Sequence, residues 1–244
     1  MIQSKKTVLM VFNKDIKRDQ LSIEQTKYLG FILDSKYTDE HHLVKGKQGA
    51  FASLSKLNFL GINTNYLCPF MKGQLFKIFI RPTLYYGMEN VYLHKYKLNQ
   101  IKRLDGNILK KIFMVPTRCR STSLKLALNI TPVNEHIALI KLEFYRRLMK
   151  NRYTNLIIEE TKSITLEKDL KSEIFKLLEY YDDPLLQSQL SLSERIEAVR
   201  YIIKANINAE KTCNDEYENV KEVLHFKNRE EIPTKLFDLI KFKF

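Results

Sequence analysis

Ile80-Arg81-Pro82-Thr83-Leu84-Tyr85-Tyr86-Gly87-Met88-Glu89 is the stretch of this sequence that says most about its fold. It lies inside an apolar segment, residues 67–93, whose length favours a long helix. Pro82 has no backbone N–H and its ring clashes with the preceding turn, so it is expected to kink or split that helix. Arg81 then stands at a helix bend, where it could reach a phosphate or cap the helix before the proline.

Helical periodicity dominates most of the chain. Only 7 Gly and 6 Pro occur among 244 residues, which disfavours a fold with many turns, and abundant Lys, Leu, Ile and Glu favour helices. Pro116 is expected to end one helix and Pro132 to begin another. The apolar spacing predicts helices over residues 39–60, 97–114 and 121–128, from residue 132 onward, and near residues 167–181, 191–205, 214–226 and 233–242. The fold class is therefore expected to be mainly α.

The N-terminal residues favour β structure instead. Residues 7–12, Thr-Val-Leu-Met-Val-Phe, form an unbroken β-rich run that predicts a buried strand. A second β-type run covers residues 28–33 and is interrupted by Gly30, where a bulge or the close approach of another backbone is expected. Together the two runs predict a short antiparallel β hairpin ahead of the helices.

Charge is distributed unevenly along the chain. The sequence has 41 Lys and Arg against 28 Asp and Glu, a net charge of +13. Residues 41–152 hold 20 basic and 4 acidic groups, whereas residues 1–40 hold 7 and 6, and residues 153–244 hold 14 and 18. The middle segment, at +16, would attract a polyanion such as a nucleic-acid backbone. A basic surface that serves solubility is the alternative explanation.

Cysteines and apolar runs narrow the class of protein. Cys68, Cys119 and Cys213 are far apart and form no C-x-x-C motif, so neither a zinc site nor a disulfide framework is indicated, and a reducing compartment fits. No apolar run approaches the length of a membrane span, and the N-terminus lacks the apolar region of a signal sequence. We therefore expect an intracellular protein, nuclear or cytoplasmic, without membrane association.

Three short blocks carry a family resemblance: Lys5-Lys6-Thr7, Lys27-Tyr28-Leu29-Gly30-Phe31, and the stretch that begins at Ile80. In this order and spacing they resemble the downstream end of a reverse transcriptase from a non-LTR, LINE-like retrotransposon. The resemblance runs from about residue 3 to about residue 155. It implies that the first block follows the catalytic aspartates, that the second grips the primer strand, and that the third lies in a helical thumb.

The same resemblance implies a domain organisation. Residues 1–36 would form the palm end, a primer-grip-like β hairpin; residues 37–155 would form a basic, helical, thumb-like bundle; and residues 156–244 would form a helical C-terminal extension. The palm strands with the metal-binding aspartates would lie before Met1, so catalysis by this chain alone is not expected. Magnesium would be needed only if a palm domain completed the chain, and no other cofactor or metal site is expected.

Residues that bind nucleic acid are expected in the second block and among the basic residues of the middle segment. Tyr28 offers a flat face and a hydroxyl, and Gly30 lets backbone approach a strand closely. By the resemblance, Lys6 would lie near the triphosphate and assist pyrophosphate departure as an accessory group. The candidate nucleic-acid-binding residues are Tyr28, Leu29, Gly30, Lys45, Lys47, Lys72, Lys77, Arg81, Lys102, Arg103, Arg118, Arg120, Arg146 and Arg147.

Two further motifs are compatible with metal binding but are interpreted otherwise. Tyr180-Tyr181-Asp182-Asp183 matches the Y-x-D-D pattern of polymerase metal sites, yet helical spacing precedes it and Pro184 follows. It is interpreted as an acidic turn that ends a helix. His41 and His42 are adjacent in sequence and point apart, so a capping and surface role is expected rather than metal binding.

The favoured function is that of a non-catalytic fragment of a LINE-like reverse transcriptase. Its partner would be a template–primer duplex of RNA or DNA, and a separate palm-containing polypeptide is a further candidate partner. Two alternatives stay open: a domesticated nucleic-acid-binding or ribonucleoprotein scaffold protein, and a degenerate, truncated open reading frame.

Overall fold

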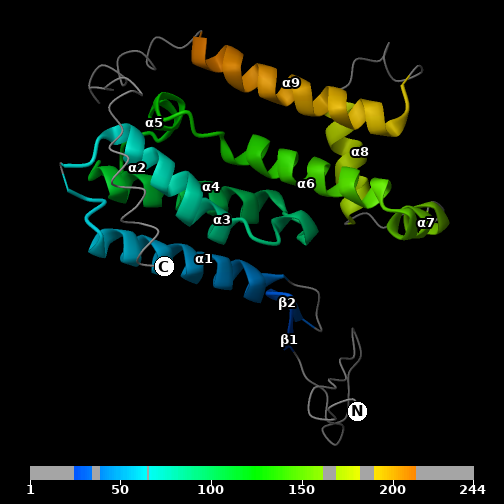
Figure 1. Cartoon of the computed structure of the whole chain (residues 1–244), viewed down its shortest axis with the longest axis horizontal. Helices are drawn as coiled ribbons and strands as arrows, with labels where there is room; N and C mark the ends of the chain where they lie inside the picture. Colours follow the sequence, from blue (N-terminus) through cyan, green and yellow to red (C-terminus); the bar gives the residue numbers. More distant parts are fainter. Residues whose placement is uncertain (1–24, 35–38, 65, 162–168, 182–189, 213–244) are drawn as a thin grey trace, which may run out of the picture.

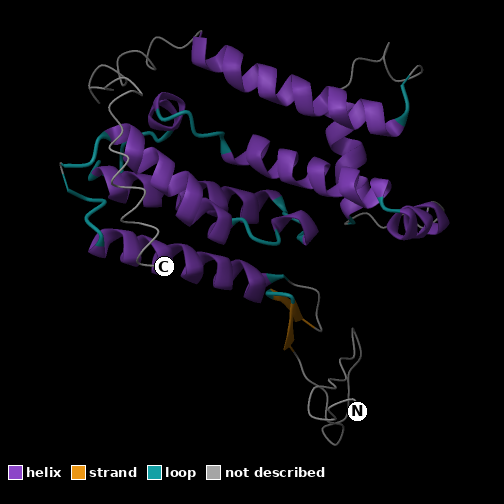
Figure 2. Ribbon diagram, viewed as in Figure 1, coloured by secondary structure: helices purple, strands orange, loops and turns teal. Residues whose placement is uncertain are grey.

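The computed structural model describes residues 25–34, 39–64, 66–161, 169–181 and 190–212. Helices make up most of this part of the chain, and its β structure is one antiparallel hairpin at the N-terminal side (Figure 2). The expected fold class, mainly α with a short N-terminal hairpin, is confirmed. Residues 7–12 and the two helices expected after residue 213 lie outside the described residues, as does Lys6.

The hairpin uses different strands from those expected. Strands β1 (Gln25–Tyr28) and β2 (Phe31–Asp34) pair with Tyr28 opposite Phe31, so residues 28–33 are not a single strand. Leu29 and Gly30 form the turn between them, with φ of 46° and 86°. Two successive positive φ values are typical of the two-residue turns that match the twist of paired strands. Gly30 therefore closes a turn, and the expected bulge was wrong.

The first apolar core is built by the segment from α1 to the start of α6. Its largest fully buried side chains include Phe76, Ile80, Leu84, Ile108 and Ile112. These side chains come from neighbouring helices that pack pairwise. The elements are α1 (Glu40–Phe59), α2 (Pro69–Leu75), η2 (Phe76–Ile80), α3 (Arg81–Leu84), η3 (Met88–Asn90), α4 (Lys95–Phe113), α5 (Thr122–Ala127) and α6 (Val133–Lys150).

The helix over residues 69–84 changes its winding just before Pro82. Elements α2 and α3 are joined by η2, a five-residue π-helical turn. Because Pro82 cannot donate to the carbonyl four residues earlier, the α-helical hydrogen-bond pattern must be broken near this point. The expected interruption at Pro82 is confirmed, and it takes the form of a π turn.

A second apolar core lies on the other side of α6. Ala138, Leu142 and Tyr145 of α6 pack against apolar residues of α8 (Leu170–Tyr181) and α9 (Leu192–Thr212). In Figure 1, α6 runs between α1 on one side and α9 on the other. The helices expected near residues 167–181 and 191–205 are thus confirmed. Helix α7 (Arg152–Glu160) was not expected, and it buries no residue.

Two negative findings concern the described residues alone. None of their helices has the length and apolarity needed to cross a bilayer. Within the same ranges, no group of three His, Cys, Asp or Glu side chains is placed to hold a metal ion. Tyr180 and Tyr181 are the last two residues of α8, which confirms the helical context of the Y-x-D-D pattern, while Asp182 and Asp183 lie outside the described residues.

Candidate nucleic-acid interface

The turn of the hairpin is held by two hydrogen bonds from the helical part of the molecule. The Tyr86 hydroxyl donates to the Leu29 carbonyl at 2.6 Å, and the Lys45 ammonium donates to the Gly30 carbonyl at 2.5 Å. Leu29 adopts a left-handed conformation that costs a residue with a Cβ on the order of 1 kcal/mol. Both turn carbonyls are thus fixed by contacts far away in sequence, and these contacts offset the strain.

His42 of α1 locks the hairpin from the other side. Its ring stacks on Phe31 with centroids 4.0 Å apart. The Ile32 N–H can only donate, so Nδ1 of His42 accepts it at 3.4 Å, and Nε2 carries the proton that it donates to the Tyr86 carbonyl at 2.8 Å. His42 is buried, so the expected surface role was wrong. The ring is buried because it connects α1 to strand β2 and to the backbone of Tyr86.

Gly87 is the residue at which only glycine fits. It has φ of 73°, and a Cβ built there would lie 2.7 Å from His42 Nε2 and 2.9 Å from Phe31 Cδ2. A side chain would therefore meet both a disfavoured backbone conformation and the two rings that lock the hairpin. This close approach lets Tyr86 reach the hairpin turn.

Helix α1 approaches α3 closely through two more glycines. A Cβ at Gly46 would lie 3.1 Å from the Leu84 carbonyl oxygen, and one at Gly49 would lie 2.6 Å from Thr83 Cγ2. Each glycine inside a helix costs roughly 1 kcal/mol relative to alanine, which close packing must offset. The small residues place α1 directly against the segment that carries Pro82.

A groove of about 660 Å³ opens between the hairpin, α1 and α3. Its lining includes Lys27, Lys45, Gly49, Pro82 and Tyr86, and we call it the turn groove. Beside it, at the hairpin tip, the Tyr28 side chain is 65% exposed, and Tyr86 is 56% exposed. Exposed aromatic faces next to ammonium groups can contact sugars and bases while lysines meet phosphates. The turn groove therefore brings aromatic rings and ammonium groups close together.

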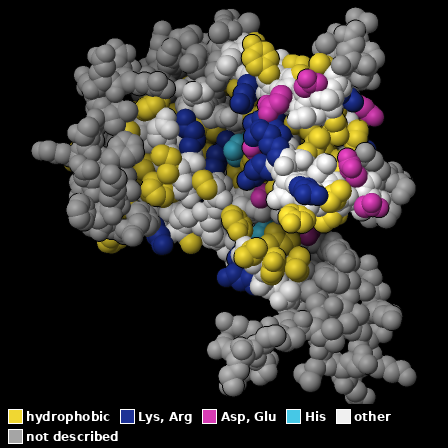
Figure 3. All heavy atoms as spheres, turned by 45° about the vertical axis from the view of Figure 1, so that its right-hand side comes forward, with side chains coloured by type: hydrophobic (Ala, Val, Ile, Leu, Met, Phe, Trp, Pro, Cys, Tyr) yellow, Lys and Arg dark blue, Asp and Glu magenta, His cyan; other side chains and the backbone are white. Residues whose placement is uncertain are grey.

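The other candidate basic residues do not form one continuous surface. Arg118 and Arg120 are exposed in the loop before α5, and α5 lies far from the hairpin in Figure 1. On the face in Figure 3, Lys and Arg side chains gather in the middle, above the apolar side chains of the hairpin. Among the candidates, Lys47, Arg103 and Arg147 are also exposed, and Lys77 and Lys102 are partly exposed.

Arg81 was expected to be accessible at a helix bend, but the structure places it inside the protein. Its side chain is buried, 4% exposed, and it forms a bidentate pair with Asp105, with Nε to Oδ1 at 3.2 Å and Nη2 to Oδ2 at 3.3 Å. The Lys125 ammonium contacts Oδ2 at 2.7 Å, and the Tyr85 hydroxyl donates to Oδ1 at 2.9 Å. We call these four residues the Asp105 cluster. It joins α3, α4 and α5, and Asp105 engages Nε and Nη2 of the Arg81 guanidinium.

The cluster shifts the pKa values of its members. Burial alone would raise the pKa of Asp105, but Arg81 and Lys125 hold that pKa below its usual range. Burial, with the nearby Asp105 carboxylate, raises the pKa of Tyr85 well above its usual range. For His136, which packs edge-on against Tyr85, burial and the positive charge of Arg81 lower the pKa to about 4. The carboxylate is therefore charged and the imidazole neutral at pH 7.

Two other candidates are also less accessible than expected. Lys72 is buried at 6% exposure, its ammonium lies 5.8 Å from the Phe113 ring centroid, and burial lowers its pKa. Arg146 is partly buried and pairs with Glu143 on its own helix and with Glu197 of α9. Neither side chain is therefore a free surface cation. The charge pattern of a sequence does not reveal which cations fold inward.

Comparison with known proteins supports the retrotransposon relationship. The chain is 27% identical over 124 residues to the RNA-directed DNA polymerase from mobile element jockey of Drosophila funebris, and equally to that of Drosophila melanogaster. Half of this chain is similar to a reverse transcriptase. The aligned part spans only 13% of each relative's length. No protein-family model matches the chain, and no solved structure gives a significant match.

Two of the blocks that resemble reverse transcriptases meet in space. Leu29 of the Tyr-Leu-Gly block accepts the hydrogen bond from Tyr86 of the block that contains Arg81 and Pro82. Gly87, in the same block as Tyr86, provides the close approach that this contact needs. The two blocks thus form one structural unit, the junction of hairpin and helices.

Proposed function

We propose that this chain binds a template–primer duplex along the turn groove, as the thumb-side part of a non-LTR reverse transcriptase. The observation that carries the proposal is the hairpin turn itself. Tyr28 and Leu29 project from it, and Lys27 and Lys45 line the groove beside it. A strained, multiply anchored turn with exposed aromatic and basic neighbours is typical of a binding surface.

Electrostatics supports the same partner. Residues 41–152, which include α4 and all of α1 except Glu40, carry a net charge of +16. Lysines that meet phosphates position a nucleic acid without reading its sequence. Binding is therefore expected to be weakly sequence-specific and salt-sensitive, with log K falling by about 0.9 per log unit of salt for each neutralised phosphate of B-form DNA.

The first experiment tests the groove with matched variants. Tyr28→Ala removes an exposed ring at the hairpin tip, whereas Tyr66→Ala removes a ring that is 97% exposed in the loop after α1. We expect Tyr28→Ala to weaken binding of a recessed RNA–DNA or DNA duplex about fivefold or more, on the scale of one aromatic contact. Tyr66→Ala should bind as wild type does. Equal losses in both variants would contradict the placement in the turn groove.

A charge-matched pair tests the electrostatic part. Lys27→Gln removes a lysine that lines the turn groove, and Lys204→Gln removes an exposed lysine of α9. Each variant changes the net charge equally, so a general charge effect would lower both affinities alike. We expect only Lys27→Gln to weaken binding and flatten the salt dependence. Absence of duplex binding at low salt would favour the degenerate open reading frame.

We further propose that these 244 residues bind the duplex without extending a primer. The Y-x-D-D pattern begins in the last turn of helix α8, whereas a polymerase metal site of this pattern sits in a strand hairpin. Binding should then persist in EDTA, and polymerisation would need a palm-containing partner or segment. A primer-extension assay with magnesium or manganese checks this. Extension abolished by Asp182→Ala with Asp183→Ala would overturn it.

A further inference from the structure

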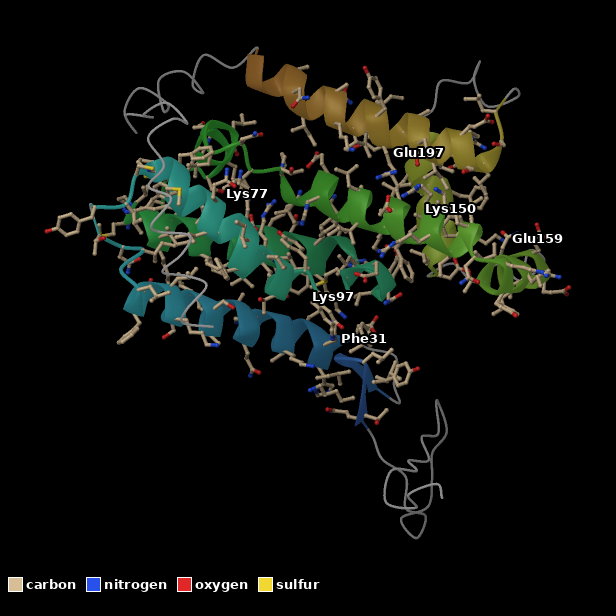
Figure 4. The ribbon with its side chains drawn as sticks, in the orientation of Figure 1. Phe31, Lys77, Lys97, Lys150, Glu159 and Glu197 are labelled. Atoms are coloured by element: carbon tan, nitrogen blue, oxygen red, sulfur yellow. The ribbon has the colours of Figure 1, made fainter. Side chains whose placement is uncertain are left out.

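A second cavity, of about 400 Å³, lies on another side of α3 from the turn groove, and Pro82 lines both. Its polar lining comes from Arg81, Thr131, His136 and Lys77, and we call it the Arg81 cavity. Figure 4 shows Lys77 near the beginning of α6, and its ammonium lies 3.4 Å from the Asn129 carbonyl in the loop before that helix. The cavity therefore has a buried cation at one wall and a second cation at its rim.

Among the described residues, the buried cluster beside this cavity has more positive than negative charge. In the Asp105 cluster, one carboxylate faces both Arg81 and Lys125, so the buried cluster carries one excess positive charge. His136 adds none, because burial and Arg81 lower its pKa to about 4. Lys77 lies at the rim and donates to the Asn129 carbonyl. Excess charge buried in a low-dielectric site is costly unless an anion compensates it.

The guanidinium of Arg81 also has hydrogen-bonding capacity to spare. Its Nε–H and one Nη2–H bind Asp105, and Nη2 also donates to the Thr131 carbonyl at 2.7 Å. A guanidinium has five N–H donors, so the two on Nη1 are left over, and among the described residues no partner for them is found. The carboxylate and the carbonyl hold the guanidinium plane rigidly, which presents a fixed donor pair.

We propose that the Arg81 cavity binds a phosphate group. An Nη1–H of Arg81 would donate to one of its oxygens, and the Lys77 ammonium and the His136 ring also line the cavity and can meet the others. A carboxylate has only two oxygens and would leave one of these groups unused. The phosphate comes either from a bound nucleic-acid backbone or from a free phosphate or phosphomonoester, since both present the same anionic oxygens.

Inorganic phosphate is the probe for the site, with sodium chloride at matched ionic strength as the control. The readout is the NMR titration of the His136 ring, identified by its loss in His136→Gln. An anion beside Arg81 offsets the positive field at His136, so the titration midpoint should rise from about 4 in phosphate and not in chloride. An unchanged midpoint at millimolar phosphate would overturn the proposal.

Two lysine variants test whether the phosphate binds in the Arg81 cavity. Lys77→Gln removes the rim cation and leaves the Asp105 cluster intact, so phosphate should bind several-fold more weakly to a folded protein. Lys176→Gln, in α8, is the matched control and should behave as wild type. Equal weakening in the two variants would place the phosphate elsewhere and overturn the site. Arg81→Gln is a harsher test, because Asp105 then loses a buried partner.

A competition measurement identifies the source of the phosphate and does not depend on the proposed duplex function. If inorganic phosphate weakens duplex binding more than matched chloride does, and Lys77→Gln abolishes this difference, the site takes a backbone phosphate. If phosphate shifts the His136 titration and leaves duplex affinity unchanged, the site takes a free phosphate. A chain that binds no duplex can still show the His136 shift, so the two proposals fail separately.

Discussion

The molecule contains two groups of ion pairs that differ in their surroundings. The Asp105 cluster lies inside the first core, and the Asp105 side chain is 0% exposed. The second group, which we call the surface network, joins α6 to α9 through Glu143, Arg146, Glu197 and Arg200, and the Glu197 side chain is 50% exposed. Buried partners cannot be replaced by water, whereas exposed ones can. Similar contacts should therefore have very different effects on stability.

Removal of the central carboxylate should have the largest effect. Asp105→Ala leaves Arg81 and Lys125 buried without their shared counter-ion and removes the acceptor of the Tyr85 hydroxyl. We expect the free energy of unfolding to fall by about 3–5 kcal/mol. Urea denaturation followed by circular dichroism measures it. A loss below about 1 kcal/mol would show that water reaches the cluster and would remove the contrast with the surface network.

A substitution at Gly87 sharpens the contrast between buried and exposed contacts, because Gly87 fixes the hairpin to the part of the first core that holds Tyr85. Gly87→Ala combines left-handed backbone strain with a Cβ placed 2.7 Å from His42 Nε2. We expect a loss of about 2 kcal/mol or more in unfolding free energy. Gly61→Ala is the matched control, because Gly61 has φ of 86° and a Cβ there would meet nothing closer than 3.4 Å.

The Gly61→Ala control separates backbone strain from steric overlap. Gly61→Ala should lose only about 1 kcal/mol, the cost of the backbone conformation. Gly87→Ala should also lower duplex affinity if the turn groove binds nucleic acid, since His42 and Phe31 must move to admit the methyl group. Equal losses of stability in the two variants would mean that the hairpin yields easily.

Sequence periodicity predicted the helices better than it predicted their junctions. The apolar spacing located α4, α6, α8 and α9, because each buries one face. It missed α7, which buries no residue, and it could not foresee that Leu29 would adopt a positive φ and split a β-type run into a hairpin. Turn conformation at a non-glycine residue depends on contacts from distant segments, here those of Tyr86 and Lys45.

The candidate site was predicted unevenly for a related reason. Lys45 lines the turn groove and Tyr28 lies beside it at the hairpin tip, but the inward positions of Lys72 and Arg81 are not visible in a tally of charge. One signal was available: Asp105 lies one turn after Ile101 and one turn before Ile108, on an apolar helix face. An acidic residue at such a position indicates a buried cationic partner.

The pH dependence of stability extends the comparison to His136, which lies against Arg81. Its pKa is about 4 in the folded protein, against an ordinary value of 6.5, so the unfolded chain takes up the proton first. Stability should therefore fall as the pH drops from about 6.5 to about 4 and should level off below that range. In phosphate-free buffer, the loss should be on the order of 3 kcal/mol greater than in His136→Gln. Parallel curves for the two proteins would contradict burial of a neutral ring.

The smallest effect is expected at the surface network. Glu197→Gln keeps the shape of the side chain and removes the carboxylate that faces Arg146 and Arg200. Both arginines still contact Glu143, and solvent replaces the lost partner, so unfolding free energy should fall by about 0–1 kcal/mol. The wild-type advantage should shrink as salt rises from low to molar concentration, because exposed charges are screened.

For Asp105→Asn the corresponding loss should be larger and nearly independent of salt, since the Asp105 side chain is fully buried. A salt-independent loss at Glu197 comparable to that at Asp105 would show that α9 shields the network from water and that both ion-pair groups are effectively internal.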